Sequence, residues 1–397
     1  MRAVLPVVRA LVQAGHEVLV VLPTHLTTVF DGSGARVEPA MPNLVDAMVA
    51  EAAKLPATAG DGTLSPEDFT APRVKMMDFV AGPHLCGTYQ AVLPLAQDFR
   101  PDLVLRDGGE LCGVLVAEKL GIPHISAPSG TGNIIDPESA NELLNQRRKE
   151  VGLRERADVW SLYAHGRLDC VPHAYSFAEY PVPPAFTYRQ PTPGPGQHVL
   201  PAELAALSGD KPIVPASVGS SLPVLLEMQA RGLDLPDDML EPAETFHAIV
   251  KALSSVDCHV VVSTGGVHID TAELGPNIRL MDFVPQPLLL QHTQLFLTHC
   301  GYNSIREAIR AGTPMAALPQ FGDQHHNANR LAEMGLGEWI TDVSPSGVAT
   351  VVEQVLHDKK IRQNVRTAQR AMLDLPDIET AVTHLECLAA RTTAPRS

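Results

Sequence analysis

The sequence predicts an α/β protein built from two doubly wound, Rossmann-like domains that face each other across a cleft. Three observations carry this prediction. The chain has 397 residues, enough for two or three domains. A strand–helix–strand unit at 101–127 indicates a parallel sheet in the first half, and a second alternating series begins near residue 213. Between them lies a stretch crowded with proline, which can be neither helix nor central sheet.

Composition excludes several classes of protein. The 45 acidic residues outnumber the 30 basic ones, and a net charge of −15 argues against binding to a nucleic-acid backbone. No run approaches the ~18 apolar residues of a membrane helix, and no apolar signal-peptide core follows Met1. The six cysteines are scattered, which disfavours both a disulfide framework and a metal site. We therefore expect a cytoplasmic monomer or homodimer without a metal or a membrane partner.

In the first half, apolar periodicity predicts elements that alternate between helix and strand. A helix at 5–13 is stopped by Ala14-Gly15-His16 and feeds a strand at 17–22. The segment 30–73 is polar and gives little signal. The strand–helix–strand unit is predicted at 101–107, 113–120 and 124–127.

The second half repeats the alternation and places most of its strands before polar turns. We expect strands at 213–217, 259–263, 278–281, 294–299 and 315–318, with helices at 243–253, 304–311 and 327–334 and a largely helical tail over 347–390. The predicted boundaries are an N-terminal domain at 1–190, a proline-rich linker at 191–205, a C-terminal domain at 206–375 and a helical tail at 376–397. Ligands of such domains bind beyond the carboxyl ends of the strands.

The most informative motif joins the fourth strand of the second half to the helix after it. The strand ends at His299, a tight turn follows at Gly301, and the helix is predicted to begin near Ser304. Unpaired N–H groups and the dipole of a helix start attract anions, and His299, Asn303 and Ser304 would add donors to a phosphate. Glu307 lies one turn further and could accept a hydrogen bond from a sugar hydroxyl. The spacing of Ser304 and Glu307 equally fits a structural capping box, and His299 could be an ordinary strand-end histidine.

Two flanking segments favour the ligand interpretation. Upstream, Phe283 sits in a turn stiffened by proline, where a flat base could stack, although a core phenylalanine would read the same way. Downstream, Asp323 and Gln324 follow a buried strand, and a carboxylate beside an amide suits vicinal hydroxyls. The alternative for Asp323 is an ordinary helix N-cap. The adjacent His325-His326 pair reads as loop polarity, because no third metal ligand is evident.

At this point the sequence resembles the donor-binding signature of the family 1 glycosyltransferases, which use nucleotide sugars and have the GT-B fold. The resemblance is carried by ordered blocks at 283–286 (Phe-Val-Pro-Gln), 298–308 (Thr-His-Cys-Gly-Tyr-Asn-Ser-Ile-Arg-Glu-Ala), 312–315 (Gly-Thr-Pro-Met) and 323–324 (Asp-Gln). Weaker similarity reaches most of the chain, at 15–18, 101–104, 120–123 and 218–221.

The resemblance implies a role for each matching residue. The residues expected to bind the donor are Gly219, Ser220, Phe283, Gln286, His299, Gly301, Asn303, Ser304, Glu307, Asp323 and Gln324. Gly219 and Ser220 would lie near the phosphates, Gln286 near the base and ribose, and Glu307 on the ribose hydroxyls. Asp323 and Gln324 would bind the transferred sugar. Phe283 and Tyr302 stand where the family commonly has tryptophan.

The implied activity is inverting transfer of a hexose from a UDP- or dTDP-sugar to a hydroxyl of a small apolar acceptor, as in natural-product and antibiotic biosynthesis. The first domain would bind the acceptor, a polyketide or flavonoid, and the second the nucleotide sugar. The donor is a co-substrate, so we expect no cofactor. No metal is expected either, because the helix after His299 would stabilise the leaving diphosphate.

The start of the sequence departs from the family pattern. A first strand and a loop with the catalytic histidine normally precede the helix found here at 5–13, and His16 belongs to a later turn. Asp107 matches the aspartate that orients that histidine, although alone it reads as a plain loop acid. We favour an incomplete N-terminal domain. The alternatives are another base, such as Glu110 or His124, or a non-catalytic nucleotide-sugar-binding or auxiliary homologue that lacks the base. A nucleotide-sugar epimerase fits the motifs less well.

Overall fold

The chain forms two α/β units. One comprises Met1–Gln190 with Pro376–Ser397, and the other comprises Pro191–Leu375. The computed structural model describes residues 3–47, 77, 79–191, 199–219, 230–231, 242–267 and 274–393. The C-terminal segment therefore returns to the first unit after the chain has completed the second.

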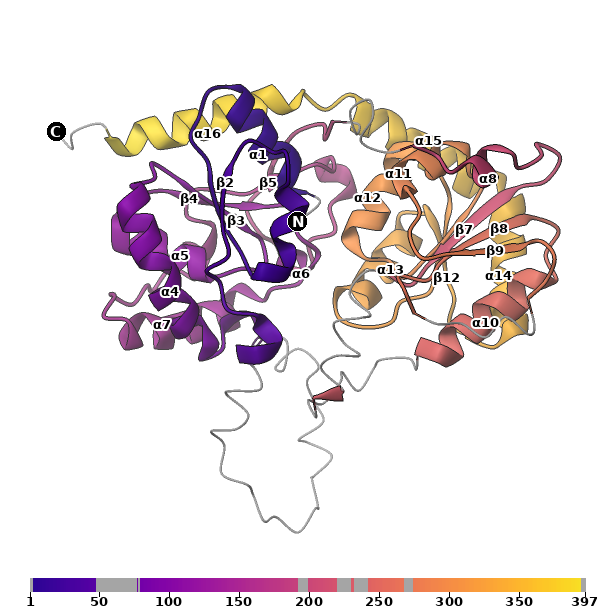
Figure 1. The fold of residues 1–397 in the computed structure, drawn as a ribbon, viewed down its shortest axis with the longest axis horizontal. Helices are drawn as coiled ribbons and strands as arrows, with labels where there is room; N and C mark the ends of the chain where they lie inside the picture. Colours follow the sequence, from indigo (N-terminus) through magenta and orange to yellow (C-terminus); the bar gives the residue numbers. More distant parts are fainter. Residues whose placement is uncertain are drawn as a thin grey trace, which may run out of the picture. The chain divides into compact units, whose positions relative to one another are not determined.

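The second unit is organised around one parallel sheet of six strands (Figure 1). The order across the sheet is β12-β11-β10-β7-β8-β9. The strands are β7 (Ile213–Ser217), β8 (His259–Ser263), β9 (Ile278–Met281), β10 (Phe296–Thr298), β11 (Met315–Ala317) and β12 (Gly337–Trp339). The chain runs outward from β7 through β8 to β9, then returns to β10 on the other side of β7. The winding direction thus reverses between β7 and β10, which confirms a doubly wound domain.

Helices cover both faces of this sheet. Figure 1 shows α10 (Pro242–Ser254) and α14 (Pro345–His357) on one face, and α12 (Tyr302–Ala311) and α13 (Asp323–Glu333) on the other. The helix α15 (Lys359–Leu373) packs against α12. Short turns of helix occur at α8 (Ala202–Ala205), α11 (Gln286–Leu289) and η5 (Leu290–His292).

Part of the predicted linker belongs to the core of the second unit. Residues 192–198 of the segment 191–205 lie outside the described residues. Leu204 in α8, however, is buried in one cluster with Val261, Val284 and Leu289. The end of the proline-rich stretch therefore packs as part of the domain.

The strands of the first unit pair in parallel. They are β1 (Leu19–Val21), β2 (Arg36–Glu38), β3 (Val104–Asp107), β4 (His124–Ala127), β5 (Leu168–Asp169) and β6 (Phe186–Thr187). The pairs are β1–β2, β3–β4 and β5–β6, and an isolated bridge from Ser126 to Arg167 joins β4 to the start of β5. The helices are α1 (Val4–Gln13), η1 (Thr24–Phe30), α4 (His84–Phe99), α5 (Cys112–Leu120), α6 (Gly130–Asn133), α7 (Pro137–Glu150), η3 (Val159–Tyr163), η4 (His173–Tyr175) and α16 (Ile378–Thr393). The predicted strand–helix–strand unit is confirmed.

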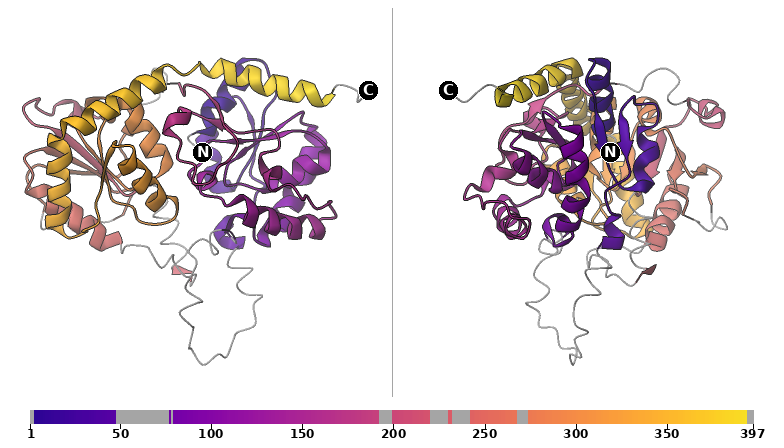
Figure 2. Two further views of the ribbon diagram at one scale, coloured as in Figure 1. Left: turned by 180° about the vertical axis from the view of Figure 1, so that it is seen from behind. Right: turned by 60° about the vertical axis from the view of Figure 1, so that its left-hand side comes forward.

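Two helical layers enclose β3 and β4. On one side α4, α5 and α7 bury a cluster that includes Leu115 and Leu144. On the other side α1 packs along α16, as both views of Figure 2 show. Val7 of α1 and Ala381 of α16 are fully buried together with Ile125 and Tyr188. The core of the first unit is therefore closed by a helix that lies beyond the second unit in the sequence.

Candidate functional site

The predicted phosphate motif lies where the winding of the second unit reverses. The backbone N–H of His299 donates to the carbonyl of Ser217 over 3.1 Å, and its ring Nδ1 lies 3.2 Å from the same oxygen. The side chain is 9% exposed. The imidazole thus sits at the carboxyl end of β7, beside the end of β10, where ligands bind in folds of this kind.

Two glycines make room for this imidazole. A Cβ atom on Gly219 would lie 2.5 Å from the Nε2 of His299, and a Cβ on Gly301 would overlap the same atom. Gly219 also has a φ of +92°, a conformation that side chains disfavour. The structure therefore brings Gly219, His299 and Gly301 together as predicted, whereas Ser220 lies outside the described residues.

The start of α12 differs from the prediction. Gly301 is the N-cap and the helix begins at Tyr302, so Ser304 is the third residue of the helix. No side chain caps α12, and the N–H of Ser304 donates to the carbonyl of Gly301 over 2.9 Å. The capping-box interpretation of Ser304 and Glu307 is therefore wrong. Glycine is a permitted N-cap, but its lack of a side chain leaves no signal that distinguishes it in sequence.

Glu307 instead accepts a hydrogen bond from Gln286, another residue predicted to bind the donor. The side-chain amide of Gln286 donates to Glu307 Oε2 over 2.7 Å and to Ser304 Oγ over 3.3 Å. Gln286 is the first residue of α11, so these bonds tie the turn after β9 to the first turns of α12. Gln286 from one sequence block thus forms a polar cluster with Ser304 and Glu307 from another.

Asn303 is oriented by a residue that the sequence analysis missed. Arg306, 2% exposed, donates to Asn303 Oδ1, and its guanidinium lies 5.4 Å from the ring centroid of Tyr302. Because the carbonyl oxygen of Asn303 accepts from Arg306, its amide nitrogen is the group that can donate to a ligand. The available signal was an arginine within an otherwise apolar helix face.

Phe283 presents its ring to solvent. It is 62% exposed, whereas the next residue, Val284, is buried. The turn is held by Asp282, which accepts a hydrogen bond from Thr264 Oγ1 at 2.9 Å. The core interpretation of Phe283 is therefore wrong, and the ring is placed where a base could stack.

Asp323 and Gln324 occupy the first turn of α13. The N-cap is Gly322, so the N-cap alternative for Asp323 is also wrong. Asp323 Oδ2 accepts from Asn327 Nδ2 at 2.8 Å, and the same nitrogen donates to the Cys300 carbonyl at 2.9 Å. Burial raises the pKa of Asp323 to about 6. These bonds connect the start of α13 to the turn between β10 and α12.

Gln324 supports the turn before α13. Its Oε1 accepts from the backbone N–H of Gln320 at 2.8 Å and of Phe321 at 3.3 Å. The side chain is 3% exposed. Gln324 therefore shapes the turn with its oxygen, and its amide nitrogen is the atom suited to a sugar hydroxyl.

Asp107 lies in the first unit, at the end of β3. Its Oδ1 accepts from the N–H of Gly109 at 2.9 Å. The preceding residue, Arg106, is 3% exposed and donates to the carbonyls of Asp107, Gly108 and Glu110 at 3.0–3.2 Å and of Leu162 at 2.6 Å. The turn that carries Asp107 is thus fixed by a buried guanidinium, which again the sequence analysis missed.

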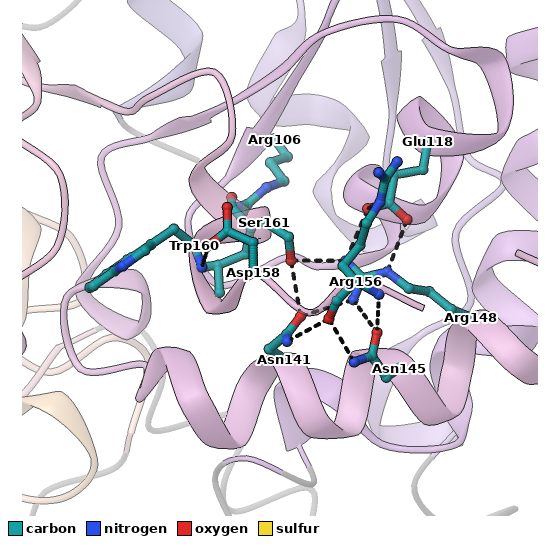
Figure 3. Close-up of polar contacts among 10 residues, drawn as sticks. Arg106, Glu118, Asn141, Asn145, Arg148, Arg156, Asp158, Trp160 and Ser161 are labelled. Atoms are coloured by element: carbon teal, nitrogen blue, oxygen red, sulfur yellow. Dashed lines mark hydrogen bonds and ion pairs between the residues drawn. The ribbon is translucent and has the colours of Figure 1, made fainter. Parts of the chain in front are cut away.

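A second buried guanidinium anchors the element that supplies the Leu162 carbonyl. Arg148 of α7 forms a bidentate pair with Glu118 of α5, with distances of 3.0 and 2.9 Å, and donates to Ser161 Oγ at 3.1 Å (Figure 3). Asn141 and Asn145 accept from the same guanidinium. The network joins α5, α7 and η3, so the Asp107 turn rests on a connected polar framework.

Neither alternative base is placed for proton transfer. Both carboxylate oxygens of Glu110 accept backbone bonds at the start of α5, from Cys112 at 2.6 Å and Gly113 at 2.9 Å. His124 is 2% exposed within β4, and burial together with Arg106 and His165 holds its pKa well below the usual value. These contacts give both residues a structural role and favour neither as the general base.

The described residues show neither a metal-binding cluster nor a membrane-spanning helix. They contain no group of three or more His, Cys, Asp or Glu side chains arranged to hold a metal ion. No helix in that part of the chain is both long and apolar enough to cross a membrane.

Comparisons with known proteins fit this site. A family model described as UDP-glucoronosyl and UDP-glucosyl transferase matches residues 239–388. The NDP-glycosyltransferase YjiC of Bacillus subtilis is 25% identical over 325 residues, which cover 76% of each protein.

Solved structures match along nearly the whole chain. The glycosyltransferase SnogD of Streptomyces nogalater superimposes with a TM-score of 0.72 and 20% identity, over 98% of this chain and 95% of that protein. The glycosyltransferase VinC, solved in complex with dTDP, gives a TM-score of 0.68 and 21% identity, over 98% and 96% respectively. The similarity of fold therefore extends over both units, whereas the family model matches mainly the second.

Proposed function

We propose that the chain, which has the GT-B fold, is a family 1 glycosyltransferase that transfers a hexose from a UDP- or dTDP-sugar to a hydroxyl of a small apolar acceptor. One observation carries the donor assignment. The imidazole of His299 is held between Gly219 and Gly301 at the start of α12, at the carboxyl ends of β7 and β10. A helix N-terminus with an imidazole beside it suits an anion, which supports a diphosphate at this point.

The remaining donor contacts follow from the groups around this point. The exposed ring of Phe283 would stack on the base, and Glu307, oriented by Gln286, would accept from a ribose hydroxyl. Asn303 would donate to the diphosphate, and the pair Asp323 and Gln324 would bind the sugar. Either nucleoside suits Glu307, because the 3′-hydroxyl is common to ribose and deoxyribose. The solved complex of the similar VinC with dTDP supports including thymidine donors.

The proposed chemistry is a single displacement at the anomeric carbon. The acceptor oxygen forms a bond to this carbon as the bond to the diphosphate oxygen breaks, and the nucleoside diphosphate leaves with the electron pair. Negative charge that develops on the diphosphate meets the positive end of α12 and the side chain of His299. The acceptor proton passes to a general base. In the family this base is a histidine that has no counterpart in this sequence, and we propose that the carboxylate of Asp107 occupies the position that orients it. Attack opposite the leaving group inverts the anomeric configuration.

We further propose that the enzyme acts in the cytoplasm on natural-product acceptors. Its cysteines form no disulfide in the structure, which suits a reducing compartment. The fold similarity to solved structures described as a calicheamicin glycosyltransferase and a spinosyn forosaminyltransferase supports an acceptor of the natural-product class.

The test combines donor binding with donor consumption. UDP-glucose and dTDP-glucose are titrated calorimetrically, and each is then incubated with a panel of flavonoid and polyketide aglycones and analysed by mass spectrometry. A new hexosylated acceptor with inverted anomeric configuration supports the proposal. Binding without transfer to any acceptor would indicate a non-catalytic nucleotide-sugar binder. Isomerised donor in the absence of acceptor would indicate an epimerase, and no binding of either donor would contradict the assignment of the site.

A further inference from the structure

The protonation pattern of His299 is set by a backbone carbonyl. Ring Nδ1 lies 3.2 Å from the Ser217 oxygen. A carbonyl oxygen can only accept a hydrogen bond, so Nδ1 carries a hydrogen atom. In the neutral ring the other nitrogen, Nε2, then has a lone pair and no hydrogen.

Nε2 is also the ring atom that faces the turns of the anion site. It lies within 2.5 Å of the position that a Cβ would take on Gly219, and a Cβ on Gly301, the N-cap of α12, would overlap it. The diphosphate diester of a nucleotide sugar offers only acceptor oxygens at neutral pH. A contact between such an oxygen and Nε2 requires a hydrogen on Nε2 as well as the one on Nδ1.

We propose that His299 binds the donor diphosphate as an imidazolium, so that nucleotide-sugar binding takes up one proton. This inference rests on the proposed function, since it requires a diphosphate at the start of α12. A charge-assisted bond of this kind is stronger than a neutral one. It would give the enzyme a donor affinity that falls as pH rises, although the donor itself does not titrate.

Proton uptake by His299 must be distinguished from the titration of other ionisable groups in this region. They are Cys300 in the adjacent turn, Arg306 and Glu307 on α12, Asp323 on α13, and Asp282, whose carbonyl accepts from the Gly265 turn near Gly219. Burial raises the pKa of the Cys300 thiol, which therefore stays neutral at physiological pH. Asp323, with a pKa of about 6, is ionised above pH 7. The described part of β7 and its following turn, 213–219, contains no ionisable side chain.

The proposal is tested by calorimetry at pH 7 to 8.5, with UDP-glucose or dTDP-glucose as the probe. Titrations in buffers of different ionisation enthalpy give the number of protons taken up on binding. We expect close to one proton per donor at pH 8, falling as pH is lowered because the free ring is then already charged. The Kd should rise by up to tenfold per pH unit above the titration of the free ring.

Variants assign the proton to one residue. His299→Gln keeps an N–H donor but cannot titrate, so its proton uptake should vanish and its Kd should lose most of its pH dependence. His292→Gln, an exposed histidine in η5, is the matched control and should keep the uptake. Uptake that persists in His299→Gln but disappears in Asp323→Asn would overturn the assignment.

A direct measurement covers the case in which His299→Gln fails to fold. The ¹⁵N chemical shifts of the His299 ring in the wild-type donor complex at pH 8 should report two protonated nitrogens. Donor binding with a neutral ring and no proton uptake would overturn this inference and leave the proposed function intact. Failure of both nucleotide sugars to bind would instead contradict the proposed function itself.

Discussion

The imidazole of His299 leaves no room for a methyl group on its glycine neighbours. Gly301 shows this most cleanly, because its φ of −63° and ψ of 138° suit any residue and only the close approach requires glycine. Gly301→Ala should displace the ring and weaken donor binding by tenfold or more, measured as the calorimetric Kd. Gly209→Ala, with no atom within 4 Å of the added Cβ, is the control and should bind normally. Unchanged donor affinity in Gly301→Ala would show that the ring does not contact the donor.

Glu307 should act on donor affinity and not on helix stability. Its carboxylate accepts from Gln286 and α12 has no side-chain cap, so Glu307→Gln removes a charged acceptor without removing a cap. We expect a loss of donor affinity of about 1.5–3 kcal/mol, the usual range for a hydrogen bond to a charged group. The Tm should change little. Glu333→Gln, on the exposed side of α13, is the charge-matched control, and a loss of Tm without a loss of affinity would assign Glu307 a structural role.

Asp107 should affect turnover and not donor binding. Asn at this position keeps an oxygen for the N–H of Gly109 but loses the charge that orients a base. Asp107→Asn should lower kcat by a factor on the order of 10²–10⁴, the usual contribution of a general base, and leave the donor Kd unchanged. Asp102→Asn, on the exposed turn before β3, is the control. If Asp107→Asn weakened donor binding as much as it lowered kcat, the role of Asp107 would be to stabilise the fold of the first unit.

The sequence reveals the chemistry of these residues better than their partners. Phe283, Asp323 and Gln324 could be selected because an aromatic, a carboxylate and an amide after buried strands suggest ligand contacts. Their alternatives as core or capping residues could be rejected only with the structure, because burial and N-caps depend on tertiary placement. Arg306 stands out in sequence only as an arginine on an apolar helix face, and its role could not be predicted because it depends on contacts with Asn303 and Tyr302 in the folded helix.

At the scale of elements, β4 and the segment after η3 are joined by a histidine pair. The backbone N–H of His124 donates to ring Nδ1 of His165 at 3.3 Å, and the centroids of the two rings lie 5.3 Å apart in an edge-to-face arrangement. Burial lowers the pKa of both rings, that of His124 well below its usual value. The folded state therefore keeps them neutral, whereas the unfolded chain protonates them near pH 6.5.

This pair should make the first unit sensitive to acid. Its contribution to stability is complete above about pH 6.5 and is lost as pH falls below that value, by up to about 1.4 kcal/mol per pH unit for His124. His165→Gln keeps a neutral acceptor, so its Tm should fall less than that of the wild type between pH 7.5 and pH 5.5. Comparing the two proteins cancels Asp323, whose raised pKa stabilises the fold in the opposite direction. If the Tm of the two proteins fell equally between pH 7.5 and pH 5.5, the histidine pair would make no contribution to the acid sensitivity.

How well each element could be predicted depends on where its stability comes from. Strands β4, β7, β8 and β9 have the predicted bounds. In β7 and β8 this follows from apolar runs with β-branched residues whose centres are buried. In α7 the few apolar residues give little periodic signal, and the helix is held by the buried Ala140 and Leu144 together with the polar network around Arg148. The strands β2 and β12 have three residues each, too few to show a period. At α13 the predicted start was four residues late, because its first turn is polar.

At the scale of the whole molecule, the stability of the first unit should depend on α16. Ala381 is fully buried between α16 and α1. Ala381→Asp should destabilise the first unit by at least about 3 kcal/mol, because it buries a charge without a partner. Calorimetric unfolding with and without nucleotide sugar identifies the two units, since ligand raises the Tm of the unit that binds it. In Ala381→Asp, the Tm of the unfolding transition that does not respond to donor should fall.

The control for this prediction lies on the same helix. Thr383→Asp adds the same charge at an exposed position and should leave both transitions in place. Loss of the donor-responsive transition in Ala381→Asp would show instead that α16 supports the second unit.

The return of α16 also sets the order in which a nascent chain can finish its two units. On a ribosome, domains usually fold in the order of synthesis. Here Pro191–Leu375 is continuous and is synthesised in full before Ile378, Ala381 and Leu385 exist to close the earlier unit. The unit that begins first therefore completes last. Until then, its apolar groove along α1 and β4 lacks the helix that covers it, which makes this stage of biosynthesis the one most exposed to chaperones and aggregation.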